Sequence, residues 1–163
     1  MNARSPARIL TVEDDPIVRA DLRLVLETAG FDVCADARDG VEAVDLAREH
    51  RPDLILIDLG LPQLDGVEAT RRILGERDVP IVALTGHRSG ELVDRAVEAG
   101  VVGHVLKPFH EAHLVETLND ALAERATHDE AVLRGQMILI ERMQRQGRSD
   151  REITRALEDQ TRS

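Results

Sequence analysis

Apolar runs alternate with amphipathic stretches up to about residue 125. Five runs rich in branched apolar residues predict strands, at 9–12, 31–34, 54–57, 81–84 and 101–106. Apolar residues at helical spacing predict helices near 16–29, 41–50, 66–76, 90–99 and 111–125. The boundary residues agree, because Asp15-Pro16 is a typical helix start, and Gly30 and Gly100 stand where left-handed caps are common.

Strands that alternate with helices favour an open parallel sheet with helices on both faces. The predicted fold class is therefore α/β, with a doubly wound five-stranded parallel sheet and a helical extension at the C-terminal end. In such sheets, ligands bind outside the carboxyl ends of the strands. The residues directly after each strand are therefore the candidates for a functional site.

Polar and charged residues follow four of the predicted strands. They are Glu13, Asp14 and Asp15 after the first strand, Asp58 after the third, Thr85 and Gly86 after the fourth, and Lys107-Pro108 after the fifth. If these strands are neighbours, their carboxylates converge, and such crowding is costly unless a cation lies among them. Carboxylates without histidine or cysteine suit a hard ion, so Mg²⁺ is the expected cofactor.

The remaining residues at the strand ends suit a phosphoryl group. Lys107 is the only lysine among 21 basic residues, and its compact ammonium differs from a planar guanidinium. Lys107 and the metal would neutralise phosphoryl oxygens, Thr85 would donate a hydrogen bond, and Gly86 would keep the approach open. Asp58 could then attack phosphorus and form an acyl phosphate. Each residue alone fits ordinary cap or turn chemistry, but their coincidence at strand ends favours the phosphoryl site.

From about residue 7 to 125 the sequence resembles the receiver domains of two-component response regulators. The resemblance is carried by "ILTVEDDP", "LILIDLGLPQLDG", "IVALTG" and "AGVVGHVLKPF", in the family's order and near its spacing. It implies a flavodoxin-like sheet of strand order 2-1-3-4-5 in a domain at 1–125, with an extension at 126–163. It also implies that Asp58 receives a phosphoryl group from a histidine kinase or phosphotransfer protein, and that the only catalysis is the chain's own phosphorylation and dephosphorylation.

The resemblance also implies a set of metal ligands. Glu13 and Asp14 match the family's acidic pair, which leaves Asp15 as a helix cap. The ion would be held by Asp14, Asp58 and the backbone carbonyl of Gly60, with Glu13 acting largely through water.

The same resemblance assigns Thr85 as the switch hydroxyl and Lys107 as the phosphate-binding lysine, with a cis peptide bond before Pro108. A rival class is the Mg²⁺-dependent phosphohydrolases of the haloacid dehalogenase type, which typically carry a second aspartate two residues after the nucleophile. Gly60 occupies that position and argues against a hydrolase. A further alternative is a binding module that works without phosphorylation, but such a module would not need the complete set of residues at the strand ends.

Two histidines lie at positions where receiver domains vary. His104 stands where the family usually has tyrosine or phenylalanine, and its charge can change near neutral pH. We therefore expect weaker or pH-sensitive coupling to the face formed by the fourth helix, fifth strand and fifth helix, unless His104 is a surface residue of no consequence. His87 and Gly60 match two positions that tune the lifetime of the phosphoryl group.

Residues 126–163 predict two further helices. A capping box at Thr127–Glu130 precedes apolar spacing over 132–143, Gly147 interrupts the chain, and Ser149 or Asp150 caps the second helix. This tail is expected to be an interaction element, with a homodimer formed through it or through the face that includes the fifth strand. A second interpretation is a nucleic-acid module, because segment 135–159 weakly resembles ANTAR-type RNA-binding modules and segment 147–157 resembles the opening of LuxR-type helix-turn-helix domains. A third interpretation is that the tail is a degenerate remnant of such a module.

Composition narrows the class of protein. Residues 1–124 carry a net charge of −11 and should repel nucleic acid, whereas residues 125–163 carry +1, which leaves nucleic-acid binding by the tail open. The tail, however, lacks the strong net positive charge and the aromatic residues expected of a nucleic-acid surface. No run approaches the roughly 18 to 20 apolar residues of a membrane helix. The start of the sequence has no apolar signal segment, and the single cysteine, Cys34, excludes an intramolecular disulfide. A cytoplasmic protein is the expectation.

Overall fold

The computed structural model describes residues 5–86 and 90–161. The strands are β1 (Arg8–Val12), β2 (Asp32–Ala37), β3 (Leu54–Asp58), β4 (Ile81–Thr85) and β5 (Gly103–Leu106). The helices are α1 (Pro16–Thr28), α2 (Gly40–His50), α3 (Gly66–Glu76), α4 (Gly90–Ala99), α5 (Glu111–Arg145) and α6 (Asp150–Thr161). The chain divides into two compact units, Met1–Leu122 and Ala123–Ser163.

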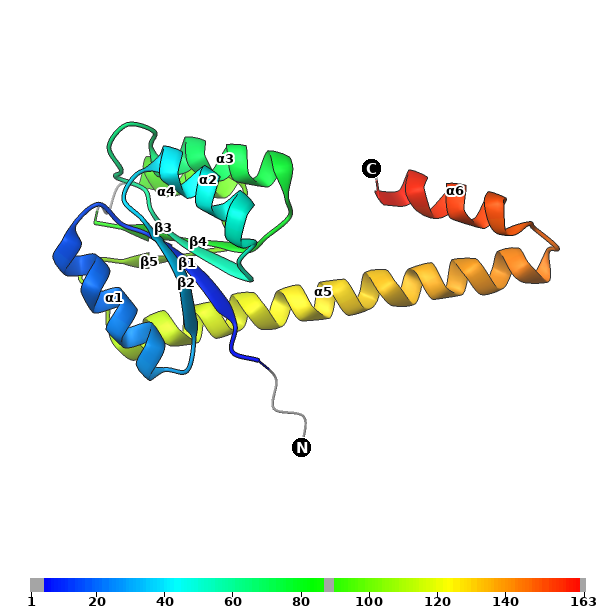
Figure 1. Ribbon diagram of the computed structural model, residues 1–163, viewed down its shortest axis with the longest axis horizontal. Coiled ribbons are helices and arrows are strands. Elements are labelled where there is room, and N and C mark those ends of the chain that lie inside the picture. The colour runs from blue at the N-terminus through cyan, green and yellow to red at the C-terminus, as the bar shows by residue number, and fades with distance from the viewer. Residues whose placement is uncertain (1–4, 87–89, 162–163) are drawn as a thin grey trace. The chain divides into compact units, whose positions relative to one another are not determined.

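The five strands form one parallel sheet of order β2-β1-β3-β4-β5 (Figure 1). The predicted doubly wound fold and its strand order are therefore confirmed. The chain leaves β1 toward β2 on one side and enters β3 on the other, so the switch point lies between β1 and β3. Side chains that follow these two strands meet at the carboxyl edge of the sheet, where open α/β sheets bind ligands.

Helices cover both faces of the sheet in the first unit. On one face, Leu10 and Ile55 pack in a core with residues of α2, α3 and α4. On the other face, Ile9 and Leu56 pack with residues of α1 and of the first part of α5, including Leu118. All five residues of β3 and of β4 are buried, which explains their unbroken apolar sequences.

The start of α3 lies directly against the end of β3. A Cβ atom on Gly66 would stand 2.3 Å from the carbonyl oxygen of Asp58, so no larger residue fits without displacing the backbone. The Gly66 amide donates to the Leu59 carbonyl at 3.3 Å, and the Asp65 side chain caps the helix by accepting from the Glu68 amide at 2.8 Å. Gly66 thus fixes the backbone beside Asp58.

The tail differs from the prediction at its first helix. Helix α5 continues without a break to Arg145, and Thr127 lies inside it, with its Oγ1 donating to the Ala123 carbonyl at 3.0 Å. The predicted capping box at Thr127 is therefore wrong. Ion pairs one helical turn apart, such as Arg125–Asp129 at 3.0 Å, support a continuous helix through this segment.

The second helix of the tail forms as predicted. Gly147 has a φ of +74°, and the Arg148 amide donates to the Met143 carbonyl at 3.0 Å, which ends α5 in a left-handed turn. The Ser149 amide donates to the Glu152 carboxylate at 2.8 Å, so Ser149 is the residue at which α6 is capped. Ile153 is the buried apolar residue of α6. Among the described residues, no helix has the length and apolarity needed to span a bilayer.

Replacing Gly66 by alanine should destabilise the protein by about 1–3 kcal/mol, because the new methyl group must push α3 away from Asp58. Gly75 lies in the same helix, and a methyl group added there would have nothing within 4 Å, so Gly75→Ala is the matched control. That control should stabilise by about 0.5–1 kcal/mol through helix propensity. Urea unfolding of both variants measures the difference, and equal changes in stability would contradict the close approach.

Candidate functional site

Three carboxylates converge at the carboxyl edge of the sheet. Glu13 and Asp14 follow β1, and Asp58 is the last residue of β3. One carboxylate oxygen from each lies within 4.8 Å of the others. Glu13 is fully buried and Asp58 is 5% exposed, whereas Asp14 is exposed to solvent. Two of the three negative charges are therefore largely withdrawn from water.

Lys107 provides the positive charge that faces these carboxylates. It follows β5, and its Nζ lies 3.1 Å from Glu13 Oε2 and 3.1 Å from Asp58 Oδ2. Burial would lower the pKa of Lys107, but its hydrogen bonds to Asp58 and Glu13 outweigh burial and hold that pKa above its usual value. Burial, followed by the nearby charge of Asp58, raises the pKa of Glu13.

Backbone contacts fix the two buried carboxylates. Asp58 Oδ1 accepts from the Gly60 amide at 3.0 Å, and Glu13 Oε1 accepts from the Asp15 amide at 3.2 Å. The Arg19 guanidinium, from α1, donates to the Glu13 carbonyl oxygen at 2.9 Å. Asp15 caps α1 by accepting from the amide of Ile17 at 2.8 Å. Asp15 therefore serves as the cap of α1, and Arg19 links α1 to the segment after β1 that carries Glu13.

The end of β4 is joined to the end of β5. Thr85 is 1% exposed, and its carbonyl oxygen accepts from the Lys107 amide at 2.8 Å. The peptide bond between Lys107 and Pro108 is cis. A Cβ atom on Gly86 would have Lys107 Cε as its nearest neighbour, at 3.9 Å, so Gly86 leaves open space beside the ammonium group.

Some candidate residues do not join this cluster. His104 lies on β5, pairs in register with Ala83 and is exposed to solvent. His87 lies outside the described residues. At the end of β2, Asp36 accepts hydrogen bonds from Thr11 and Arg23, so its carboxylate joins β1, β2 and α1 rather than the site.

Sequence reasoning missed two residues that shape the site. Gly66 brings α3 against the Asp58 backbone, and Arg19 holds the backbone of Glu13. The dipeptide Asp65-Gly66 at a predicted helix start was an available signal for a close approach of two backbones. Arg19 gave no signal, because an arginine on the first turns of a helix usually extends into solvent.

The donor set fits a divalent cation that prefers oxygen. The cluster offers one exposed and two buried carboxylates, with no histidine or cysteine ligand atoms among them. The hypothetical Cβ of Gly60 lies 3.7 Å from Asp58 Oδ1, so this glycine adds no side chain over the carboxylate. Mg²⁺ accepts such carboxylates and keeps several of its own waters, which matches the open side at Asp14.

Replacing Lys107 by methionine should destabilise the protein by about 1–3 kcal/mol, because the Glu13 and Asp58 carboxylates then lack their cation. The partial exposure of Lys107 keeps the effect below that of a fully buried pair. Adding Mg²⁺ should restore much of the loss by binding only the folded state. Urea unfolding with and without Mg²⁺ measures both effects.

The matched control is Arg134→Met, because Arg134 pairs with Glu130 at 3.1 Å on the surface of α5 and both side chains are 71% exposed. Such exposed pairs contribute about 0–1 kcal/mol. A loss of stability at Lys107 no larger than at Arg134, or one that Mg²⁺ leaves unchanged, would remove this account of the site.

Comparisons with known proteins agree on one family. A family model described as the response regulator receiver domain matches residues 9–119. The transcriptional regulatory protein PdtaR of Mycobacterium tuberculosis is 38% identical over 122 residues, which cover 75% of this chain and 60% of PdtaR. The polar-differentiation response regulator DivK of Brucella anthropi is 33% identical over 122 residues, covering 73% of this chain and 98% of DivK. The chain therefore spans about three fifths of PdtaR and nearly all of DivK.

Solved structures agree in fold. The receiver domain of the sensor histidine kinase PA1611 from Pseudomonas aeruginosa, described with a magnesium ion coordinated in its active site cleft, is 35% identical with a TM-score of 0.67, over 72% of this chain and 98% of that one. A LuxR-family two-component response regulator from Aurantimonas is 40% identical with a TM-score of 0.68, over 74% of this chain and 87% of that one.

Proposed function

This chain belongs to the receiver domain family of response regulators, and we propose that its Asp58 accepts a phosphoryl group from a histidine kinase or a phosphotransfer protein. The observation that carries the proposal is the position of Asp58. It is buried at the end of β3, faces Glu13, and is paired with the only lysine of the chain. A carboxylate that served only the core would not be paired beside other acidic groups at the ligand-binding edge.

In the proposed reaction, a carboxylate oxygen of Asp58 forms a bond to phosphorus while the bond from phosphorus to the donor's histidine nitrogen breaks. The Lys107 ammonium, already beside Asp58, pairs with the negative oxygens of the arriving group. The carboxylates of Glu13, Asp14 and Asp58, with the Gly60 carbonyl, would hold Mg²⁺. When bound, this ion supplies further positive charge at the phosphoryl oxygens.

The output of the domain is proposed to pass through Thr85 and β5. The hydroxyl of Thr85 would donate a hydrogen bond to a phosphoryl oxygen, as the switch residue of the site. The backbone bond from Lys107 to Thr85 ties β4 to β5, so a shift at Thr85 reaches the β5 surface. Val97, Val102 and Leu106 are exposed apolar residues on and beside α4 and β5, and they suit a partner that binds after the shift.

Mass spectrometry after incubation with Mg²⁺ and a small phosphodonor tests the phosphoacceptor. Wild type should gain one phosphoryl group and Asp58→Asn none. Asp15→Asn is the matched control, because asparagine also caps helices and Asp15 serves the start of α1. It should be modified like wild type. Modification of Asp58→Asn to the wild-type extent, or none of wild type, would refute the proposal.

We further propose that residues 126–163 act as an interaction element, through which the chain dimerises, rather than as a nucleic-acid module. Leu133, Met137 and Ile138 are each about 60% exposed on α5, which leaves apolar surface for a second copy. Sedimentation of the full chain with and without BeF₃⁻ should show a larger dimer fraction in the BeF₃⁻ complex. Unchanged sedimentation argues against dimerisation as the output, and specific binding of RNA or DNA by the chain at physiological salt argues for the nucleic-acid module.

Replacing His104 by tyrosine should strengthen the coupling between Asp58 and the β5 surface, because a larger aromatic ring at this position can pack against β4 when Thr85 moves. Amide chemical shift changes on α4 and β5 upon addition of BeF₃⁻ provide the measurement. His113→Tyr, on α5, is the control and should leave these changes as they are in wild type. Identical responses in all three proteins would mean that His104 is a surface residue without a switching role.

A further inference from the structure

An arginine of α1 holds the backbone between two carboxylates of the acidic cluster. Arg19 is half-buried in the first turn of the helix, and its Nη1 donates to the carbonyl oxygen of Glu13 at 2.9 Å. A guanidinium usually pairs with carboxylates, but within the described residues Arg19 forms no ion pair with any of them. The side chain thus acts on the backbone and leaves the carboxylate oxygens of the cluster available to a cation.

The three carboxylates of the cluster are not held equally firmly. The side chains of Glu13 and Asp58 each accept from a backbone amide and from Lys107. The side chain of Asp14 is exposed and, in the described part of the chain, it accepts no hydrogen bond and forms no ion pair. The position of the Asp14 carboxylate therefore depends on the backbone that carries it.

Arg19 fixes the first of the two peptide units around Asp14. The Glu13 carbonyl belongs to the peptide unit that ends at the Asp14 Cα, and because a peptide is planar, holding its oxygen also holds that Cα. The following peptide unit is held without the guanidinium, since the Asp15 amide donates to Glu13 Oε1 at 3.2 Å and the Asp15 carbonyl accepts from the Arg19 amide at 2.9 Å. Loss of the Arg19 side chain would therefore release one side of Asp14 and leave the other in place.

We propose that Arg19 is a positioning residue that places the Asp14 carboxylate for Mg²⁺ and thereby gives the site a preference for Mg²⁺ over Ca²⁺. The inference rests on the metal site of the proposed function and adds to it the origin of its selectivity. Mg²⁺ requires near-ideal octahedral geometry with oxygens at about 2.0–2.1 Å, whereas Ca²⁺ accepts roughly six to eight oxygens at about 2.3–2.6 Å in flexible arrangements. A carboxylate whose position varies therefore weakens Mg²⁺ binding more than Ca²⁺ binding.

The positive charge of Arg19 acts in the opposite direction to its positioning role. A cation beside the site repels any divalent ion, and Mg²⁺ and Ca²⁺ carry the same charge. Loss of the charge alone would strengthen the binding of both ions by similar factors. Weaker binding of Mg²⁺ together with a reduced preference over Ca²⁺ is therefore the signature of a positioning role.

Titration of the full chain with MgCl₂ and, separately, with CaCl₂ at constant ionic strength tests the proposal, with the amide resonances of Asp14 and Asp15 as the signal. Wild type should bind Mg²⁺ more tightly than Ca²⁺. In Arg19→Met the Mg²⁺ affinity should fall by about tenfold, as when a group that orients a metal ligand is removed, and the Ca²⁺ affinity should change much less. Wild-type Mg²⁺ affinity in this variant, an equal loss for both ions, or no preference for Mg²⁺ in wild type would overturn the proposal.

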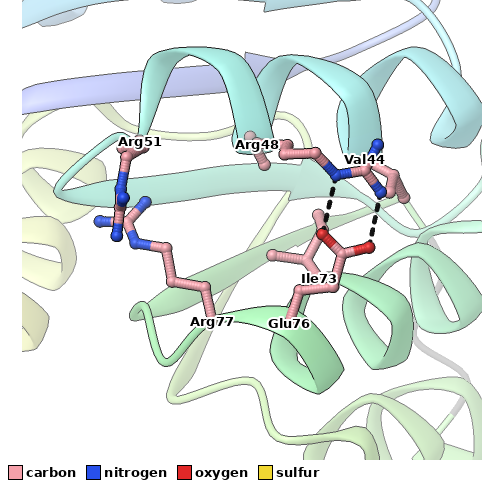
Figure 2. A pocket seen from close by; sticks show the side chains of 7 residues that line it. Val44, Arg48, Arg51, Ile73, Glu76 and Arg77 are labelled. Atoms are coloured by element: carbon pink, nitrogen blue, oxygen red, sulfur yellow. Dashed lines mark hydrogen bonds and ion pairs between the residues drawn. The ribbon is translucent and has the colours of Figure 1, made fainter.

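Two arginines outside the acidic segment provide matched controls. Arg23 lies one turn further along α1 and donates to Asp36 at 3.2 Å, so Arg23→Met removes the same charge from the same helix. Arg48 donates to Glu76 at 2.9 and 2.6 Å across the contact between α2 and α3, away from the cluster (Figure 2). Arg23→Met and Arg48→Met should both keep the wild-type ratio of Mg²⁺ to Ca²⁺ affinity. A ratio that changes in these controls as much as in Arg19→Met would also overturn the proposal.

Urea unfolding without metal checks that each variant is folded. Arg19→Lys keeps the positive charge and a donor on a flexible stem, so its ratio should lie between those of wild type and Arg19→Met, and it carries the comparison if the methionine variant does not fold. Absence of saturable Mg²⁺ binding in wild type would contradict the metal site of the proposed function itself. Mg²⁺ binding in wild type without a selective loss in the Arg19 variants would contradict only the role of Arg19.

Discussion

The ammonium group of Lys107 between Glu13 and Asp58 is the contact on which the carboxyl edge of the sheet depends. Two carboxylates that are almost fully withdrawn from water repel each other unless a cation lies between them. Lys107 reaches both at 3.1 Å from the end of a different strand. Its bonds tie the ends of β1, β3 and β5 together, although Lys107 lies 49 residues from Asp58 and 94 from Glu13 in the sequence.

Most of this arrangement was predictable because two physical rules act locally and strongly. Strands buried on both faces need continuous apolar runs, so β3 and β4 were visible in the sequence as Leu54–Ile57 and Ile81–Leu84. Parallel strands joined by helices put their carboxyl ends on one edge, so polar residues after the runs had to meet there. Glu13, Asp58, Thr85 and Lys107 could therefore be selected from the sequence alone.

The features that were missed depend on distances between segments that are remote in sequence. The role of Gly66 follows from how closely α3 approaches Asp58, and the role of Arg19 from the path of the backbone at Glu13. The capping box at Thr127 failed for a different reason. A threonine hydroxyl can bond a helical carbonyl one turn earlier as readily as it caps a new helix, and the four residues before Thr127, at 123–126, are good helix formers.

The two oxygens of Asp58 are already distinct before any donor arrives. Oδ1 is held by the Gly60 amide and Oδ2 by Lys107, so each lies in a different electrostatic setting. The oxygen that takes the phosphoryl group in the proposed reaction would exchange its present partner for the new bond. If that oxygen is Oδ2, the Lys107 side chain after β5 would turn to the phosphoryl oxygens, and if it is Oδ1, the Gly60 amide in the loop after β3 would lose its bond. The identity of the phosphorylated oxygen decides which of these two segments first registers the signal.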